Sequence, residues 1–157
     1  MKKRAILLGV MAILAFRTTA FAADATGEWL VADRTARIRI ADCGGTLWGV
    51  VSWEADPGGV DEKNPDPAKR SRPTLGMPIL LGMKAGEPNQ WAGQIYNSQN
   101  GKSYSGGLAL IRPDVLRVRG CIFGILCGGE DWTRVQLTAE DKKLPEGAAC
   151  SQRNASR

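Results

Sequence analysis

Apolar and polar residues alternate with a period of two through most of the chain, a pattern typical of strands with one buried face. In residues 35–41 (TARIRIA), alanine and isoleucine alternate with arginine. No segment between residues 24 and 137 shows a sustained 3.6-residue period with helix caps. The alternation predicts strands at Glu28–Val31, Thr35–Ala41, Gly45–Glu54, Gln90–Asn97, Gly101–Ile111, Asp114–Gly120 and Asp131–Leu137.

The strand predicted at residues 45–54 is apolar on both faces. Leu47 and Val51 fall on one face, and Trp48 and Val50 fall on the other. We therefore expect one face to meet the core and the other to meet a pocket or a neighbouring element. Short strands at close spacing, with 19 glycines in the chain, indicate an all-β fold, a small antiparallel barrel. Asn100-Gly101 is a strong hairpin signal within it.

One long connection, residues 55–89, interrupts the strands and holds six of the eight prolines. A loop of this length in a compact domain is usually functional or disordered. Its second half, Leu75–Met83 (LGMPILLGM), is too apolar for disorder, and we expect it to pack on the barrel as a short strand. The predicted organisation is a signal peptide at 1–22, a barrel domain at 23–137 and a tail at 138–157.

The first 22 residues have the features of an export signal. Lys2-Lys3-Arg4 precedes a twelve-residue apolar run, and Ala20-Phe21-Ala22 supplies small residues for cleavage after Ala22. The predicted location is therefore periplasmic or secreted. Four of the 21 basic residues lie in this segment, so the net charge of +5 falls to +1 after cleavage. That near-neutral remainder argues against nucleic-acid binding, and no later stretch is apolar enough for membrane insertion.

The four cysteines lie after the export signal, where oxidising conditions permit disulfides. They allow three pairings, and the sequence alone does not choose among them. A hairpin with Gly124 near its tip would bring Cys121 and Cys127 together and leave Cys43 for Cys150. A thiolate metal site is disfavoured, because the chain has no CxxC motif and no histidine.

The absence of histidine also excludes a Ser-His-Asp triad, a Cys-His pair and an HExxH zinc helix within this chain. Gly101-Lys102-Ser103 lacks the upstream glycine of a phosphate-binding loop. The acidic residues of the long loop lack calcium-loop spacing and are better explained as turn residues. We therefore predict no catalytic residue, no metal site and no cofactor. The five tryptophans are assigned mainly to core packing.

Several short motifs follow one another in a fixed order along the chain. They are Gly27-x-Trp29, Cys43-Gly44-x-x-Leu47-x-Gly49, Asp61-x-x-Asn64-Pro65-Asp66, Arg70-x-Arg72-Pro73-x-x-Gly76, Trp91-x-Gly93-x-Ile95-Tyr96-Asn97, Asn100-Gly101-Lys102-x-Tyr104, Leu116-x-Val118-x-Gly120-Cys121 and Trp132-x-Arg134. In this order the chain resembles the bacterial exported family known as domain of unknown function 2147. The resemblance covers residues 27–135 and implies a small lipocalin-like barrel, periplasmic or secreted, with no established activity.

The chain departs from that family at two positions. Ser98 follows Asn97 where the family often has proline. Trp48 stands where many members carry a second cysteine, so a local pair with Cys43 is not available. Set beside the family, this departure favours Cys43 with Cys150.

Three hypotheses of function follow. The first is a non-enzymatic barrel that binds a small, partly apolar ligand. Its candidate contacts are Trp48, Trp53, Trp91, Tyr96, Tyr104 and Arg119. The alternative is a protein-interaction or envelope-structural module acting through the loop at residues 61–72, with candidates Asp61, Asn64, Asp66 and Arg70. The third, ranked last, is an enzyme without histidine that uses Asp61, Asp66 or Tyr104.

Overall fold

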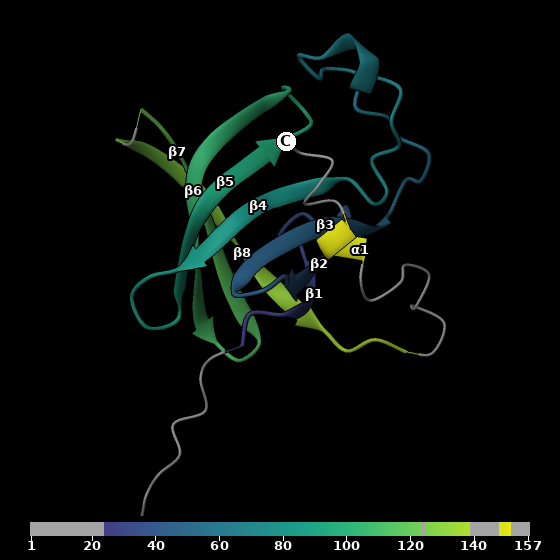
Figure 1. The fold of residues 1–157 in the computed structure, drawn as a ribbon. Coiled ribbons are helices and arrows are strands. Elements are labelled where there is room, and N and C mark those ends of the chain that lie inside the picture. The colour runs from purple at the N-terminus through teal and green to yellow at the C-terminus, as the bar shows by residue number, and fades with distance from the viewer. Residues whose placement is uncertain (1–23, 124, 139–147, 152–157) are drawn as a thin grey trace, which may run out of the picture.

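A computed structural model of the chain describes residues 24–123, 125–138 and 148–151. Within these residues, eight antiparallel strands pair in sequence order and β1 closes on β8, which gives a closed barrel (Figure 1). The expected signal peptide, and parts of the expected tail, lie outside the described residues. The strands are β1 (Gly27–Leu30), β2 (Ala36–Asp42), β3 (Thr46–Glu54), β4 (Pro78–Ala85), β5 (Gln90–Asn97), β6 (Lys102–Arg112), β7 (Val115–Ile122) and β8 (Leu126–Val135).

The all-β prediction is confirmed, and each predicted strand is present. The apolar second half of the long loop forms β4, as expected. β8 begins at Leu126 rather than at Asp131, because Gly128 and Gly129 hide its alternation. The described residues also include two short helices, η1 (Pro67–Lys69) in the β3–β4 loop and α1 (Ala148–Ser151). Among the described helices, none is long and apolar enough to span a membrane.

One end of the barrel, here called the closed end, is plugged by side chains. The Trp29 indole nitrogen donates to the Ala25 carbonyl at 2.9 Å, and the guanidinium of Arg134 lies 4.2 Å from the centre of the Trp29 ring. Arg134 also donates to the carbonyls of Asp24 and Thr26, each at 2.6 Å. This arrangement holds the segment before β1 across the barrel end. The core above it includes Trp29, Ile40, Leu47, Met83, Leu108, Leu116 and Trp132.

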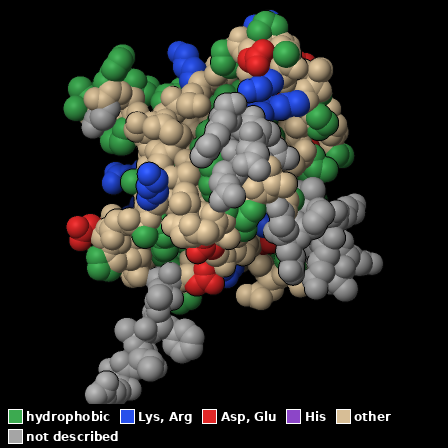
Figure 2. Space-filling model, viewed as in Figure 1, with side chains coloured by type: hydrophobic (Ala, Val, Ile, Leu, Met, Phe, Trp, Pro, Cys, Tyr) green, Lys and Arg blue, Asp and Glu red, His purple; other side chains and the backbone are tan. Residues whose placement is uncertain are grey.

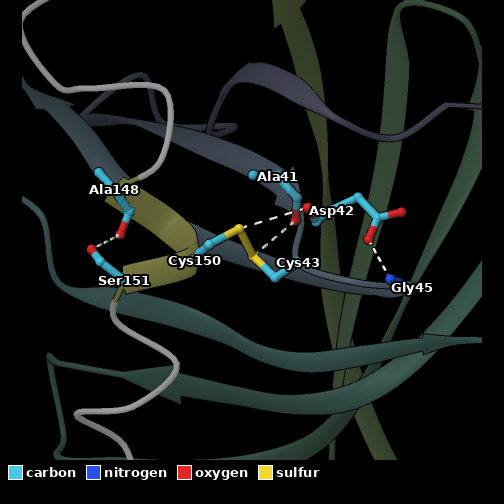
Figure 3. Close-up of a disulfide and its surroundings, with 7 residues drawn as sticks. All are labelled: Ala41, Asp42, Cys43, Gly45, Ala148, Cys150 and Ser151. Carbon is cyan, nitrogen blue, oxygen red and sulfur yellow. Dashed lines mark hydrogen bonds between the residues drawn. A yellow bond between two sulfur atoms is a disulfide. The ribbon is translucent and has the colours of Figure 1, made fainter.

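The outer face of β2 and β3 is covered by α1, which Cys150 ties to Cys43 (Figure 3). Val50 on this face is fully buried, as is Ala149 of α1. The two-sided apolar pattern of β3 therefore has one face toward the core and the other toward a neighbouring element.

The second disulfide joins Cys121 to Cys127 across the β7–β8 hairpin, with their Cα atoms 4.0 Å apart. The residues at its tip are strongly exposed, Phe123 at 91% and Ile125 at 81%. Figure 2 shows hydrophobic side chains gathered at the end of the β7–β8 hairpin, at the upper left of the molecule. Both disulfides match the pairing favoured from the sequence.

Candidate functional site

A pocket of about 830 Å³ occupies the end of the barrel opposite the plug, here called the open end. Its mouth is formed by the β1–β2, β3–β4, β5–β6 and β7–β8 connections. The last three of these lie in the upper part of Figure 1. The walls are largely apolar side chains from the inner faces of the strands. They include Ile38, Val51, Ile79, Ile95, Val118 and Trp132.

The strand register explains why this end is hollow. Gly120 of β7 pairs directly with Gly128 of β8, and both line the pocket. A Cβ atom added at Gly128 would meet nothing within 4 Å. Directly opposed residues share one face of a sheet, so this glycine pair leaves the inner wall without side chains where the barrel opens. Tyr104 stands beside it, since a Cβ at Gly120 would lie 3.5 Å from the Tyr104 Cβ.

Four carboxylates lie in the pocket lining, Asp33, Glu54, Asp56 and Glu130, and no lysine or arginine is among the described lining residues. Glu54 is paired with Ala36, and Glu130 is paired with Val118. Because Ala36 and Val118 both line the pocket, the strand register turns the two glutamates toward the interior as well. The Trp132 indole donates a hydrogen bond to Glu130.

Of the six residues expected to contact a ligand, only Tyr96 and Tyr104 are among the described pocket residues. The other four are not among the described lining residues of this pocket, because the register places them elsewhere. Trp48 is on the outer face of β3, and the Trp53 ring centre lies 5.0 Å from the guanidinium carbon of Arg37. Trp91 packs against the core near the closed end, and Arg119 is exposed on the outer face of β7.

The four candidates of the long loop belong to a network that holds the loop against the barrel. Asp61 is fully buried, and its carboxylate accepts from the Tyr96 hydroxyl at 2.6 Å and from the Asn64 amide at 2.6 Å. Arg72 adds a hydrogen bond at 2.9 Å and places its guanidinium 5.6 Å from the Tyr96 ring centre. The network joins the loop to β5.

Burial alone would raise the pKa of Asp61, but the hydrogen bonds from Tyr96, Asn64 and Arg72, with the Arg72 charge, outweigh it and lower that pKa. Burial, followed by the bond to the Asp61 carboxylate, raises the pKa of Tyr96. At neutral pH, Asp61 is therefore an anion and Tyr96 a neutral donor.

The remaining loop candidates shape the backbone. Asp66 caps η1 by accepting from the Ala68 amide at 3.0 Å, and Arg70 donates to the Asn64 carbonyl at 2.9 Å. Gly101, with φ of 69°, lies so close to the loop that an added Cβ would fall 1.8 Å from the Lys63 carbonyl oxygen. These contacts assign a structural task to each of Asp61, Asn64, Asp66 and Arg70.

The pocket acids were missed from the sequence. In β3, simple alternation after Val51 puts Trp53 inward and Glu54 outward. The register shift between Arg37 and Ile38 reverses that assignment. No local signal in the sequence marks such a bulge.

Comparison with known proteins supports the fold. A family model described as "Uncharacterized protein conserved in bacteria (DUF2147)" matches residues 27–134. No curated protein matches the chain. Among solved structures, protein HP1028 of Helicobacter pylori, described as belonging to the lipocalin family, has a TM-score of 0.70 at 17% identity. The alignment covers 82% of this chain and 97% of that one. At this identity the likeness shows a shared lipocalin-like barrel.

Proposed function

The chain belongs to the bacterial family DUF2147, whose description names no activity, and we propose that it is a non-enzymatic barrel that binds one small, partly apolar molecule at its open end. The single observation that carries the proposal is the hollow inner wall at Gly120 and Gly128, flanked by apolar side chains. The volume of about 830 Å³ falls in the range of small-molecule sites.

The proposed place of action is the periplasm or the exterior of the cell. The support is the pair of disulfides, which persist in oxidising compartments. The buried polar network around Asp61 is saturated by its own hydrogen bonds. Because the Asp61 carboxylate already accepts hydrogen bonds from three side chains, a structural role for Asp61 is favoured over a catalytic one.

The test fills the pocket without disturbing the barrel. The Gly128→Phe variant places a ring in the open space at the pocket wall, while Gly86→Phe adds the same ring in the exposed β4–β5 turn at the closed end. We expect the neutral fluorophore N-phenyl-1-naphthylamine to bind the wild type and Gly86→Phe with one site per chain. Binding to Gly128→Phe should weaken at least about tenfold, as expected when a hydrophobic pocket is blocked.

Equal binding by Gly128→Phe and the wild type would contradict the proposal, because the fluorophore would then sit elsewhere. The proposal would also be contradicted if the wild type bound neither this probe nor any of decylammonium, decanol and decanoate. Thermal unfolding of the two variants checks that both retain the barrel.

The alternative function is protein interaction through the loop at residues 61–72. The observation that favours it is the network around Asp61, which holds the loop in one shape with Glu62, Lys63 and Arg70 exposed. A preorganised loop loses little entropy on binding. Replacing residues 65–70 by Gly and Ser should abolish the capture of an envelope partner that the wild type retains. Unchanged capture would remove this alternative.

A further inference from the structure

We propose that the pocket selects an organic cation, an amine on an apolar body, over neutral and anionic molecules of the same size. This inference rests on the proposed function and names the chemical class of its ligand.

The first argument is the sign of the charges in the lining. Asp33 comes from the β1–β2 connection, Glu54 and Asp56 from the end of β3, and Glu130 from β8, so the carboxylates approach from different parts of the rim. No described lysine or arginine lines the pocket to balance them. The chain beyond residue 22 has a net charge of +1, so the acidic lining is not an average property of its surface.

The second argument is that two arginines on nearby elements are engaged elsewhere. Arg72 is bound to the buried Asp61 beneath the loop, and Arg117 of β7 forms a two-bond ion pair with Asp131 on the outer face. Neither of these two guanidinium groups is therefore paired with a carboxylate of the lining. Asp33 accepts from the Thr35 hydroxyl at 2.7 Å and from its amide at 3.0 Å, and these bonds lower the pKa of Asp33.

The third argument is the setting of the two inward carboxylates. Glu130 is oriented by the Trp132 indole, whose ring forms part of the apolar wall. One oxygen of Glu54 is buried and has no hydrogen-bond partner in the described part of the chain. A carboxylate in this condition gains from a donor brought by a ligand, and an ammonium group is both donor and counter-charge. The rings of Trp132 and Tyr104 add a surface that favours cations.

The fourth argument is the dielectric environment. Ile38, Val51 and Val118 line the same pocket as the acids, so a ligand seated against both would be partly removed from water. Apolar walls strengthen the attraction of a cation and the repulsion of an anion relative to open water. A neutral molecule gains only the apolar contacts.

The experiment compares three compounds that share one tail, decylammonium, decanol and decanoate, titrated calorimetrically into the wild-type protein below their aggregation limits. We expect decylammonium to bind roughly tenfold more tightly than decanol, with decanoate weakest. Higher salt should weaken decylammonium and leave decanol unchanged.

Two variants assign the effect to the pocket. Glu54→Gln with Glu130→Gln removes both inward charges and keeps the acceptor for Trp132, so decylammonium and decanol should then bind within about threefold of each other. Glu87→Gln removes one exposed charge at the closed end and should keep the wild-type order.

Decanol binding as tightly as decylammonium, or decanoate binding most tightly, would overturn the inference while leaving the binding function intact. Unchanged cation preference in the double variant would overturn it too. Failure of all three compounds to bind a wild type that still binds N-phenyl-1-naphthylamine would overturn the inference alone, whereas failure of all four compounds would overturn the binding function as well. If the double variant does not fold, the order of the three compounds on the wild type decides.

Discussion

Asp61 and Tyr96 show how single polar groups fix a long loop on a small barrel. Residues 55–77 contain little regular structure beyond η1, yet Asp61 is fully buried within them. A buried carboxylate is tolerated only when donors satisfy it. Three side chains supply those donors, and one of them, Tyr96, belongs to the barrel wall. The loop is therefore held by chemistry specific to a few residues.

Removing the Tyr96 hydroxyl should loosen this loop. In Tyr96→Phe the Asp61 carboxylate loses one donor in a buried site, and we expect a loss of about 1–3 kcal/mol in unfolding free energy. Tyr104→Phe is the matched control, because among the described residues its hydroxyl accepts a hydrogen bond from the exposed Asn100 amide alone. Its cost should stay below about 0.5 kcal/mol. Urea unfolding measures both. Equal losses would argue against the assigned network.

Asp61 should also contribute to acid sensitivity. Its pKa is lowered in the folded protein, so its stabilisation is complete above the unfolded value of about 3.9 and is lost as pH falls through the folded value. Unfolding free energy measured between about pH 5 and pH 2 should thus fall more steeply for the wild type than for Asp61→Asn. Parallel curves would contradict the lowered pKa of Asp61.

At the scale of elements, β1, β2 and β3 share an ion pair on their outer face. Glu28 and Arg39 are both buried and directly opposed, and the Ser52 hydroxyl also contacts the Glu28 carboxylate. The alternation in TARIRIA predicts that Arg39 faces outward, but it does not predict that this side chain is buried. That burial depends on tertiary packing, which the local alternation does not encode.

Breaking this pair should be costly. Arg39→Leu leaves the buried Glu28 carboxylate without its cation, and we expect a loss of about 3–5 kcal/mol in unfolding free energy. Arg119→Leu, an exposed arginine of β7, is the control and should change stability by less than about 0.5 kcal/mol. Adding Glu28→Leu to Arg39→Leu should recover part of the loss. No recovery would argue against an uncompensated carboxylate as its cause.

At the scale of the whole molecule, the two disulfides constrain very different lengths of chain. Cys43–Cys150 spans a sequence separation of 107 and joins α1 to the β2–β3 region, whereas Cys121–Cys127 spans 6 within one hairpin. The entropy removed from the unfolded chain grows with loop length. The long link therefore acts on the whole barrel, and the short one acts on the exposed hairpin tip.

Serine substitution of each cysteine pair tests this ranking. Loop-closure estimates give a loss of about 5 kcal/mol for Cys43→Ser with Cys150→Ser, and about 2 kcal/mol for Cys121→Ser with Cys127→Ser. Chemical denaturation under oxidising conditions compares both variants with the wild type. A larger loss of unfolding free energy on removal of Cys121–Cys127 would contradict the ranking. It would indicate that the β7–β8 hairpin depends on this disulfide for folding.

The sequence by itself determined the positions of the strands, the class of the fold and its family resemblance. It succeeded because alternation and turn residues such as Asn100-Gly101 are local properties of the chain. Only the tertiary structure decided which side chains meet. The register shift in β3 turned Glu54 inward and Trp53 outward, and the pairing of β7 with β8 turned Glu130 inward. Those outcomes depend on pairing between distant segments, and local sequence carries no record of that pairing.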